Sequence, residues 1–297
     1  MELNQLRGFY EIAREHSFTR AADKLFLTQP AISLQVKALE EELGEMLFER
    51  TRRNICMTPA GEILFQRVRE IFQHLEMARE EIAALQRELQ GRLAIGTSDT
   101  NCTYVLPGIL SAFRQRYPQV ELDIRNRMTS EVLPLVLSNE VNFGLVTLPV
   151  RHRNLVSEKL YTRPDVLICP PGHALARRKY VRLEEVGEHP LLVLERGSNS
   201  RQLLEDDFRR VGVVPEVAMS LGGIDVIKRL VEIGLGVALV PRVAVREEVE
   251  AGRLAMVAVR GFAAREIGLV EHRGRRRAPT TVAFLEILKE HVEGVKL

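Results

Sequence analysis

A repeat of apolar residues in the middle of the chain constrains its fold most. Between Leu64 and Leu89 these residues recur in alternating steps of four and three, which keeps a narrow apolar seam on one side of a helix, as in a coiled coil. Thr58-Pro59 supplies a cap and a proline for the helix start, and Gly91 ends the pattern. We predict a helix over about 59–90 that pairs with a second chain; packing against the chain's own C-terminal part is the alternative. The seam consists of Leu64, Val68, Ile71, Leu75, Ala78, Ile82, Leu85 and Leu89.

The residues before this helix predict three short helices followed by a small hairpin. The apolar positions between Leu3 and Ala13 share one face of a first helix. Ser17 is a suitable N-cap for a second helix that ends near Leu25, and Thr28 for a third. Gly44 fits the end of the third helix, and MLFERTRRNICMT (46–58) has the pattern of strand, basic turn, strand. Two helices joined by a tight turn are typical of a helix-turn-helix.

The third helix has an unusual distribution of charge. No carboxylate occurs from Thr28 to Leu39, and three then follow at Glu40, Glu41 and Glu42. A helix-turn-helix sets the leading part of its second helix into the major groove, and DNA carries one charge about every 1.7 Å. The pattern therefore favours contact with duplex DNA; an ordinary three-helix domain with a charged hairpin is the alternative. Ile32, Val36, Leu39 and Leu43 form the apolar stripe, and Pro30, Ser33, Leu34 and Lys37 the opposite face.

From residue 92 the pattern changes to short apolar strands that alternate with helical stretches. This alternation predicts α/β folding with parallel sheets. The length of this part favours two small lobes joined by crossovers over one large sheet. The strand segments are RLAIGTS, VELDIRN, FGLVTL, DVLICP, PLLVLE, GVALVP and EIGLVEH.

Small polar residues follow several of these strands. In GTSDTNCTYVLP (96–107) a strand is expected to end near Gly96 and a helix to begin near Thr103. Such turns offer N–H groups and hydroxyls to anions, and α/β sheets bind ligands at the carboxyl ends of their strands. Simple helix capping is the alternative. The candidate ligand contacts are Ser98, Thr100, Asn101 and the adjacent Cys102, then Thr129, Ser130 and Thr147, and in the second lobe Ser198, Ser200 and Arg201. Because an arginine such as Arg201 suits a carboxylate or phosphate, these residues favour a small anionic metabolite as the ligand.

Composition and absent motifs exclude several classes of protein. Hydrophobic residues make up 45% and charged residues 28%, as in a soluble globular protein. No apolar run approaches the roughly 18 residues of a membrane span, and the N-terminus does not resemble a signal peptide. The three cysteines form no CxxC pair, which fits a reducing cytoplasm. We therefore expect a cytoplasmic protein with no membrane contact.

An enzyme is not expected, because HExxH, GxSxG and Walker A sequences are absent. GLGVAL (234–239) lacks the third glycine of a dinucleotide loop and follows a helix instead of opening one. No catalytic residue, metal site or cofactor is therefore assigned. An enzyme whose catalytic residues converge only in three dimensions is one alternative function. A solute-binding protein of a transporter is a second, although neither class explains residues 28–61.

The segment FTRAADKLFLTQPAISLQVKALEEELGEMLFERT (18–51) resembles the DNA-binding signature of the LysR-type transcriptional regulators. Thr58-Pro59-Ala60-Gly61 is similar to the family's entry into its linker helix. A looser similarity continues through Leu106-Pro107, Phe113, Tyr117-Pro118 and GLGVALVP (234–241). The matching positions are Ala21-Ala22, Leu25, Thr28-Gln29-Pro30-Ala31, Ser33, Gln35, Leu39-Glu40, Leu43-Gly44 and Leu47-Phe48-Glu49-Arg50.

This resemblance implies an N-terminal winged helix-turn-helix, mostly α with a small β wing. A long linker helix and a C-terminal α/β, two-lobed, periplasmic-binding-protein-like effector domain complete the implied fold. The implied function is transcriptional regulation, with activation as the expected mode, under the control of a small-molecule effector. The expected partners are double-stranded promoter DNA, the effector, further copies of the chain as homodimer and homotetramer, and RNA polymerase. The expected domains are 1–58 for DNA binding, 59–90 for dimerisation and 91–297 for the effector, with lobe I at 92–162 and 266–297 and lobe II at 163–265.

The resemblance also assigns DNA contacts and places the polar turns at segments that the family uses for effectors. Leu34 departs from the arginine of many members, and an apolar side chain there suits a thymine methyl. Asn142 stands where many members carry aspartate, and the sequence offers no reason for it. The expected DNA-binding residues are Thr28, Gln29, Pro30, Ser33, Leu34, Gln35 and Lys37 on the third helix, and Arg50, Arg52 and Arg53 in the wing.

Overall fold

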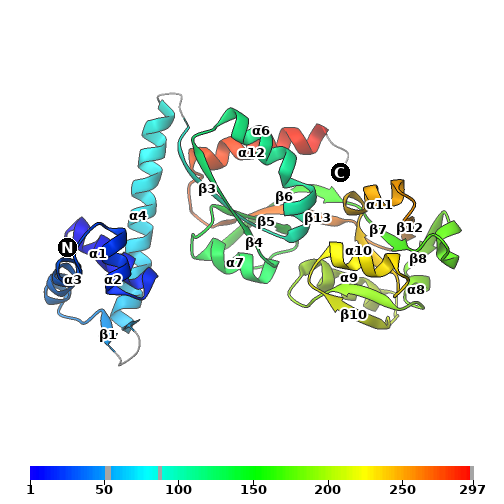
Figure 1. Cartoon of the computed structure of the whole chain (residues 1–297), viewed down its shortest axis with the longest axis horizontal. Helices are drawn as coiled ribbons and strands as arrows, with labels where there is room; N and C mark the ends of the chain where they lie inside the picture. The colour runs from blue at the N-terminus through cyan, green and yellow to red at the C-terminus, as the bar shows by residue number, and fades with distance from the viewer. Residues whose placement is uncertain (51–54, 86–88, 295–297) are drawn as a thin grey trace. The chain divides into compact units, whose positions relative to one another are not determined.

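The computed structural model describes residues 1–50, 55–85 and 89–294. The chain divides into two compact units, Met1–Ile82 and Ala83–Leu297 (Figure 1). The first unit holds the predicted helices and hairpin, and the second holds the strands that alternate with helices.

The first unit is a helix-turn-helix followed by a two-stranded wing. The hydroxyl of Ser17 accepts the N–H of Arg20, and that of Thr28 accepts the N–H of Ala31, so both predicted N-caps are confirmed. Gly44 ends the third helix in the left-handed conformation. The elements are α1 (Leu3–Glu15), α2 (Phe18–Lys24), α3 (Gln29–Leu43), β1 (Phe48–Arg50), β2 (Ile55–Met57) and α4 (Pro59–Leu85).

The long helix α4 is shorter than the repeat predicts. Its described part runs to Leu85, whereas Leu89 is not helical and packs against the core of the second unit, so the predicted continuation of the helix to residue 90 is wrong. Leu89 leaves the helical pattern, and its half-buried side chain packs against the apolar core of the sheet that begins at Gly91. Near the start of α4, Leu64 and Val68 join the core of the first unit.

The remaining described part of the seam is uncovered. Ile71, Leu75 and Ile82 are 42%, 40% and 63% exposed. An apolar stripe that stays exposed along one side of a helix marks an interaction surface.

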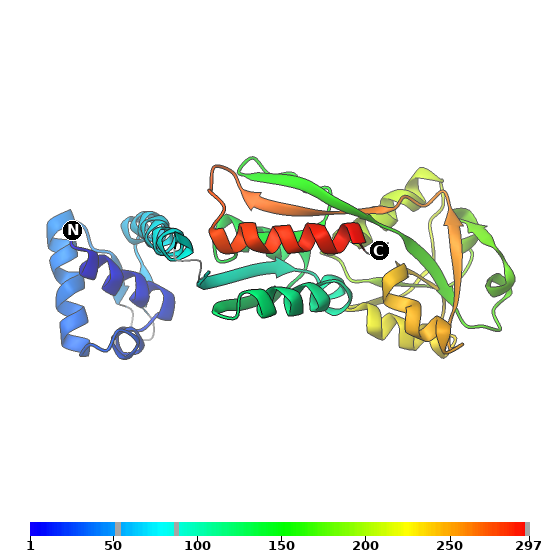
Figure 2. The same ribbon diagram turned by 90° about the horizontal axis from the view of Figure 1, so that it is seen from above.

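In the second unit, lobe I is built on a five-stranded sheet with the order β4-β3-β5-β13-β6. Helices α6 and α12 cover one face of this sheet and α7 the other (Figure 1). Strands β6 and β13 pair along their length and lead from lobe I towards lobe II (Figure 2). The elements of lobe I are β3 (Gly91–Thr97), α5 (Asp99–Tyr104), α6 (Leu106–Arg116), β4 (Val120–Asn126), α7 (Thr129–Leu137), β5 (Phe143–Thr147), β6 (Leu155–Arg163), β13 (Arg265–His272) and α12 (Pro279–Gly294).

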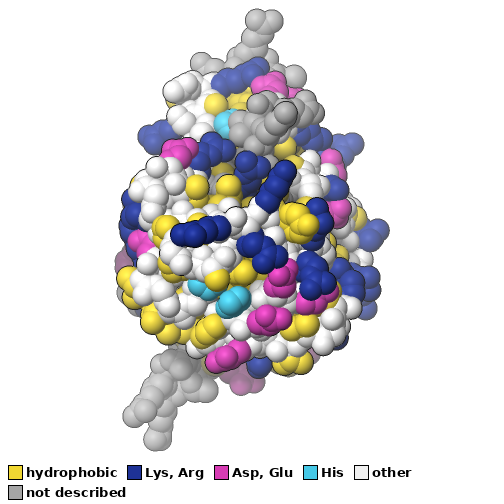
Figure 3. All heavy atoms as spheres, turned by 90° about the vertical axis from the view of Figure 1, so that its right-hand side faces the viewer, with side chains coloured by type: hydrophobic (Ala, Val, Ile, Leu, Met, Phe, Trp, Pro, Cys, Tyr) yellow, Lys and Arg dark blue, Asp and Glu magenta, His cyan; other side chains and the backbone are white. Residues whose placement is uncertain are grey.

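Lobe II contains a four-stranded sheet, β11-β7-β12-β8, and a two-stranded sheet, β10-β9. Its outer end carries lysine and arginine side chains among apolar ones, with acidic side chains gathered towards one side (Figure 3). The elements of lobe II are β7 (Asp165–Cys169), η1 (Ala174–Arg177), β8 (Tyr180–Arg182), α8 (Leu183–Val186), β9 (Leu191–Leu194), α9 (Asn199–Arg210), β10 (Val217–Leu221), α10 (Ile224–Glu232), β11 (Ala238–Pro241), η2 (Arg242–Val245), α11 (Arg246–Glu250) and β12 (Ala255–Arg260).

The pairs β3–β4, β3–β5 and β9–β10 are parallel as the alternation predicts, but the two larger sheets are mixed. Strand β13 runs antiparallel to both β5 and β6, and β7 runs antiparallel to β11 and β12. Each predicted strand segment contains a strand, but β6, β8, β10 and β12 were not predicted. The chain crosses between the lobes twice, and the return crossing brings β13 back into the sheet of lobe I in the opposite direction.

Candidate functional site

The outward face of α3 is free of core contacts over the stretch that lacks acids. The side chains of Gln29, Pro30, Leu34 and Lys37 are exposed, and Ser33 is half-buried. All five line a groove of about 920 Å³. The exposed Thr28 caps the helix at the same end. Most of the predicted DNA-contacting residues of this helix are therefore presented together.

Gln35 is the exception among these residues. Its Oε1 is buried and has no hydrogen-bond partner among the described residues, and a Cβ placed on Gly8 of α1 would lie 2.9 Å from it. Gln35 follows Ile32 by three residues, so both lie on the face that packs against α1. This orientation keeps the amide oxygen of Gln35 away from the outward face of α3, so the geometry does not support its predicted base contact, which stays a prediction.

The three acids at the end of α3 have separate structural partners. Oε1 of Glu40 accepts the N–H groups of Leu47 at 2.7 Å and Phe48 at 3.3 Å, which fixes the start of the wing. Glu41 pairs with Lys37 at 3.5 Å on the surface, and Glu42 pairs with the N-terminal ammonium group. The acids therefore organise the far end of the helix.

In the wing, Arg50 ends β1, whereas Arg52 and Arg53 lie outside the described residues.

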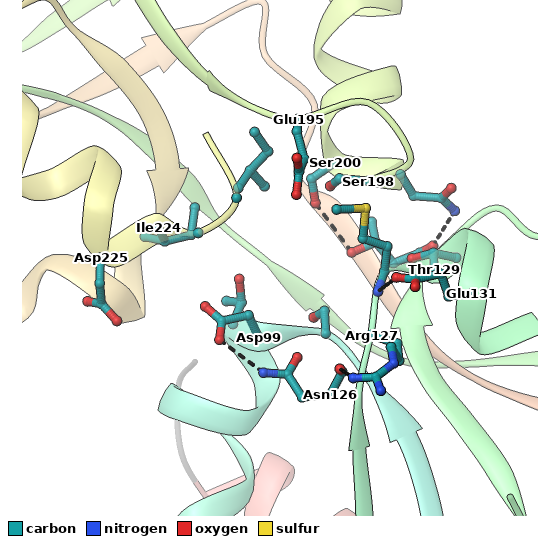
Figure 4. A pocket seen from close by; sticks show the side chains of 18 of the residues that line it. Asp99, Asn126, Arg127, Thr129, Glu131, Glu195, Ser198, Ser200, Ile224 and Asp225 are labelled. Atoms are coloured by element: carbon teal, nitrogen blue, oxygen red, sulfur yellow. Dashed lines mark hydrogen bonds between the residues drawn. The ribbon is translucent and has the colours of Figure 1, made fainter. Parts of the chain in front are cut away.

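A cavity of about 600 Å³ lies between lobe I and lobe II (Figure 4). Lobe I contributes the end of β3, the start of α5 and the start of α7, and lobe II contributes the starts of α9 and α10. We call this cavity the interlobe cleft. Six predicted contact residues line it: Ser98, Thr100, Thr129, Thr147, Ser198 and Ser200.

Three other candidates of lobe I do not line the cleft. Helix α5 begins at Asp99, four residues earlier than predicted, and this turns Asn101 towards the sheet. There its Nδ2 donates to the hydroxyl of Thr97 at 3.0 Å and to the carbonyl of Leu145 at 3.1 Å. Burial, with the charge of Asp99, raises the pKa of the Cys102 thiol to about 11, so this thiol is protonated at neutral pH. Ser130 is exposed outside the lining.

Arg201, the predicted partner of an anionic ligand, is occupied elsewhere. Its guanidinium pairs with Glu205 at 2.7 Å and donates to the carbonyl of Leu194 at 3.4 Å. The spacing of one helical turn within α9 favours this internal pair. Arg201 is therefore not among the residues that line the interlobe cleft.

Arg163, at the end of β6, is the buried arginine that reaches the cleft. It is 3% exposed and pairs with Asp165 through two hydrogen bonds of 2.9 and 3.2 Å. Its Nη2 also lies 3.4 Å from the hydroxyl of Ser200. Sequence reasoning missed it, because a single arginine at the end of a strand has no distinguishing pattern. The one available signal was two opposite charges, Arg163 and Asp165, flanking Pro164 beside an apolar strand.

The cleft also holds charged residues that the polar turns did not predict. Asp99 accepts a hydrogen bond from Asn126 at 3.2 Å, and Glu131 accepts the N–H of Met128 at 3.0 Å. The remaining charged residues of the lining are Arg127, Glu195 and Asp225, which Figure 4 shows around the cavity. The lining of the cleft therefore combines hydroxyls, carboxylates and two guanidinium groups.

Among the described residues, no group of three or more histidine, cysteine, aspartate or glutamate side chains is suited to hold a metal ion. Within the same part of the chain, no helix has both the length and the apolar character needed to cross a membrane.

A winged helix-turn-helix followed by a two-lobed domain with a ligand-sized cleft defines a DNA-binding regulator that senses a small molecule. Residues 3–62 match the family described as bacterial regulatory helix-turn-helix protein, lysR family. Residues 86–293 match the LysR substrate binding domain. The chain belongs to the LysR family of transcriptional regulators, which bind DNA and small-molecule effectors and are not enzymes.

Comparison with individual proteins agrees with this assignment. The chain is 34% identical to a RuBisCO operon transcriptional regulator of Allochromatium vinosum, over 97% of this chain and 95% of that protein. It is 30% identical to the HTH-type transcriptional activator CmpR of a Synechocystis strain, over 99% and 97% of the two chains. A full-length OxyR variant from Pseudomonas aeruginosa has the same fold, with a TM-score of 0.79 at 24% identity over 100% of this chain and 96% of that one.

Proposed function

We propose that this regulator is a cytoplasmic transcriptional activator whose signal is a small anionic metabolite bound in the interlobe cleft. The observation that carries the proposal is the convergence of hydroxyls from both lobes on this one cavity. In this proposal residues 1–58 bind promoter DNA, 59–90 dimerise and 91–297 sense the effector. Effector binding must favour one shape of a dimer or tetramer over another, since only differential affinity shifts such an equilibrium. RNA polymerase is the proposed further partner.

The start of α9 supports an anionic group on the effector. Ser198 is the N-cap residue of this 12-residue helix, and a helix start attracts negative charge through its free N–H groups. The hydroxyl of Ser200 lies 3.4 Å from that of Thr147 in lobe I, and it also lies 3.4 Å from the guanidinium of Arg163. A carboxylate or phosphate at this point contacts both lobes together.

The outward face of α3 supports the proposed DNA contacts. In this proposal Thr28, Gln29, Pro30, Ser33 and Leu34 face base edges, and Lys37 faces a phosphate. The wing contributes arginines that neutralise phosphate charges of the DNA backbone, namely Arg50, Arg52 and Arg53. The name of the Allochromatium relative, a RuBisCO operon regulator, favours carbon-fixation genes as targets.

Replacing Ser33 by alanine is expected to relax base preference at one position of the selected site. A lost base contact costs about 1–3 kcal/mol of discrimination. Arg52→Ala should instead weaken all sequences alike and lower the salt dependence by about one unit. Selection of bound duplexes from a randomised pool, followed by titrations at several salt concentrations, measures both effects. Gln35→Ala is the matched control, because its side chain points into α1, and it should leave base preference unchanged. Unchanged preference in Ser33→Ala would refute the groove assignment.

The effector can be sought by thermal unfolding of the full-length chain against carboxylates, phosphates and amino-acid precursors. A ligand at about 100 times its dissociation constant stabilises the fold by roughly 2.7 kcal/mol. We expect a hit among the anions, and expect Thr100→Ala or Ser200→Ala to abolish it. Ser130→Ala, outside the lining, is the control and should retain the shift. A hit that survives both cleft variants would place the effector elsewhere.

A further inference from the structure

A cluster of side chains joins the two lobes next to the interlobe cleft. Tyr104, at the end of α5 in lobe I, donates its phenol hydrogen to Asp225 of lobe II at 2.5 Å. Lys228, one turn further along α10, donates to the oxygen of the same phenol at 2.9 Å. The ammonium group also lies 5.1 Å from the centre of the tyrosine ring, within the range of a cation–π contact.

Lys228 is held firmly on the lobe II side of this cluster. It is 4% exposed, and its ammonium pairs with Asp225 at 2.9 Å and Glu248 at 2.8 Å. It also donates to the carbonyl of Ala244 at 2.8 Å. Burial alone would lower the pKa of Lys228, but the hydrogen bonds to Glu248, Tyr104 and Asp225 raise it above its ordinary value. The charge on Lys228 therefore persists at neutral pH.

Tyr104 is the member of the cluster that comes from lobe I. Burial, with the hydrogen bond to Asp225, raises the pKa of its phenol to about 12, so the phenol keeps its proton as a donor. The half-buried ring also packs against an apolar cluster of lobe II that includes Ile224 and Ile227. One side chain of lobe I thus takes part in both the polar and the apolar packing of lobe II.

The cluster is connected to the cleft through both lobes. Thr100, one turn before Tyr104 on α5, lines the cleft. Ile224 and Asp225, at the start of α10, line it from the other side. In Figure 4, Asp225 comes from α10 of lobe II and Asp99 from the start of α5 in lobe I. A separation of the lobes at this point must break the contacts of Tyr104.

We propose that Tyr104, Asp225 and Lys228 form a latch that holds the two lobes together before the effector binds. This inference rests on the proposed function in one respect, namely that the cleft receives the effector. Because the candidate contacts come from both lobes, the closed arrangement is the binding-competent one. The latch then raises affinity by keeping this arrangement populated, and the effector need not close the lobes by itself.

The distance between the lobes can be measured in the full-length chain without any ligand. Cysteines placed at the exposed Gln115 of α6 and Glu247 of α11 carry spin labels in a Cys56→Ser background. Dilution of labelled chains into unlabelled ones restricts the dipolar signal to pairs within one molecule. Tyr104→Phe removes one hydroxyl and both of its hydrogen bonds. Since a hydrogen bond contributes about a fivefold change in such an equilibrium, we expect the population at long interlobe distance to rise by about that factor or more.

Tyr161→Phe is the matched control, because Tyr161 is a buried tyrosine of lobe I whose hydroxyl has no partner among the described residues. It should give the distance distribution of the unmodified chain. Equal distributions for Tyr104→Phe and the unmodified chain would overturn the latch, and so would the same opening in Tyr161→Phe. A ligand hit abolished by Ser200→Ala, together with unchanged distances in Tyr104→Phe, would overturn the latch and keep the proposed function. A larger population at long interlobe distance in Tyr104→Phe, together with ligand hits that all survive Thr100→Ala and Ser200→Ala, would keep the latch and overturn the proposed function.

Discussion

Replacing both Ile71 and Ile82 by lysine is expected to leave the regulator monomeric. Both side chains are exposed on α4 along the same seam. Because Ile71 and Ile82 are 42% and 63% exposed, burying the exposed part of four such isoleucines in a dimer contributes roughly 3–6 kcal/mol. This is up to about half of the free energy of about 12 kcal/mol of a nanomolar complex. Four added ammonium groups would also face each other across the seam. Sedimentation velocity at micromolar concentration measures the loss.

A single lysine on the other side of α4 separates seam contacts from a general effect of charge. Gln66 is exposed and lies about 140° around the helix from Ile71 at 100° per residue. Gln66→Lys is expected to sediment as the unmodified chain does. If the variant with lysine at both Ile71 and Ile82 remains dimeric with its helix content intact, a surface other than the seam holds the two chains together.

Truncating Asp207 to alanine is expected to lower the free energy of unfolding by about 3–5 kcal/mol, the cost of breaking a buried ion pair from one side. Asp207 is 1% exposed, and its carboxylate pairs with Arg265 at 2.7 Å and Arg210 at 2.8 Å. Arg265 is itself buried where the chain returns from lobe II to lobe I, and its next carboxylate, Asp165, lies 3.9 Å away. Without Asp207, the buried positive charge of Arg265 has no close carboxylate partner to compensate it. Urea unfolding followed by circular dichroism measures the change, since the chain contains no tryptophan.

The adjacent residue supplies the control for this variant. Asp206 also pairs with an arginine three positions on, Arg209 at 2.5 Å, but both side chains are exposed. Exposed pairs of this kind contribute about 0–1 kcal/mol, so Asp206→Ala should lie within that range. Equal losses in the two variants would show that burial of the pair is not what makes Asp207 important.

Asn142, which had no explanation in the sequence, acquires one in the sheet. Its Oδ1 accepts the N–H of Ala94 at 2.7 Å, and its own N–H donates to the carbonyl of Ala94 at 2.7 Å. These two bonds attach the start of β5 to β3. An amide side chain accepts this hydrogen bond without bringing a charge against a half-buried sheet.

The basic loop RGRRR (273–277) is exposed over most of its length, and arginines within it also have fixed partners. In the structure Arg273 donates to the carbonyls of Arg153 and Leu155, and Arg277 pairs with Glu158 and Glu271. The loop therefore binds to other segments of lobe I, through partners up to 120 residues away in the chain.

The sequence by itself determined the elements whose causes are local. Caps such as Ser17 and Thr28, the terminating Gly44 and the stripe that includes Ile32 each act within one or two helical turns, so a short window contains the cause. The absence of acid from the leading part of α3 was visible for the same reason. These features were enough to recognise the DNA-binding unit and the family.

Tertiary structure alone decided which residues form the interlobe cleft and its surroundings. Arg163 comes from β6, and Asp225 and Lys228 come from α10. No spacing in the sequence brings these two elements to Tyr104 or Ser200. A one-turn change in where α5 begins was enough to direct Asn101 into the core while Thr100 stayed in the cleft. Hydrogen bonds and ion pairs depend on distances of a few ångströms between segments far apart in the chain. Local periodicity sets the direction of a side chain within its element, but the packing of elements determines what that side chain meets.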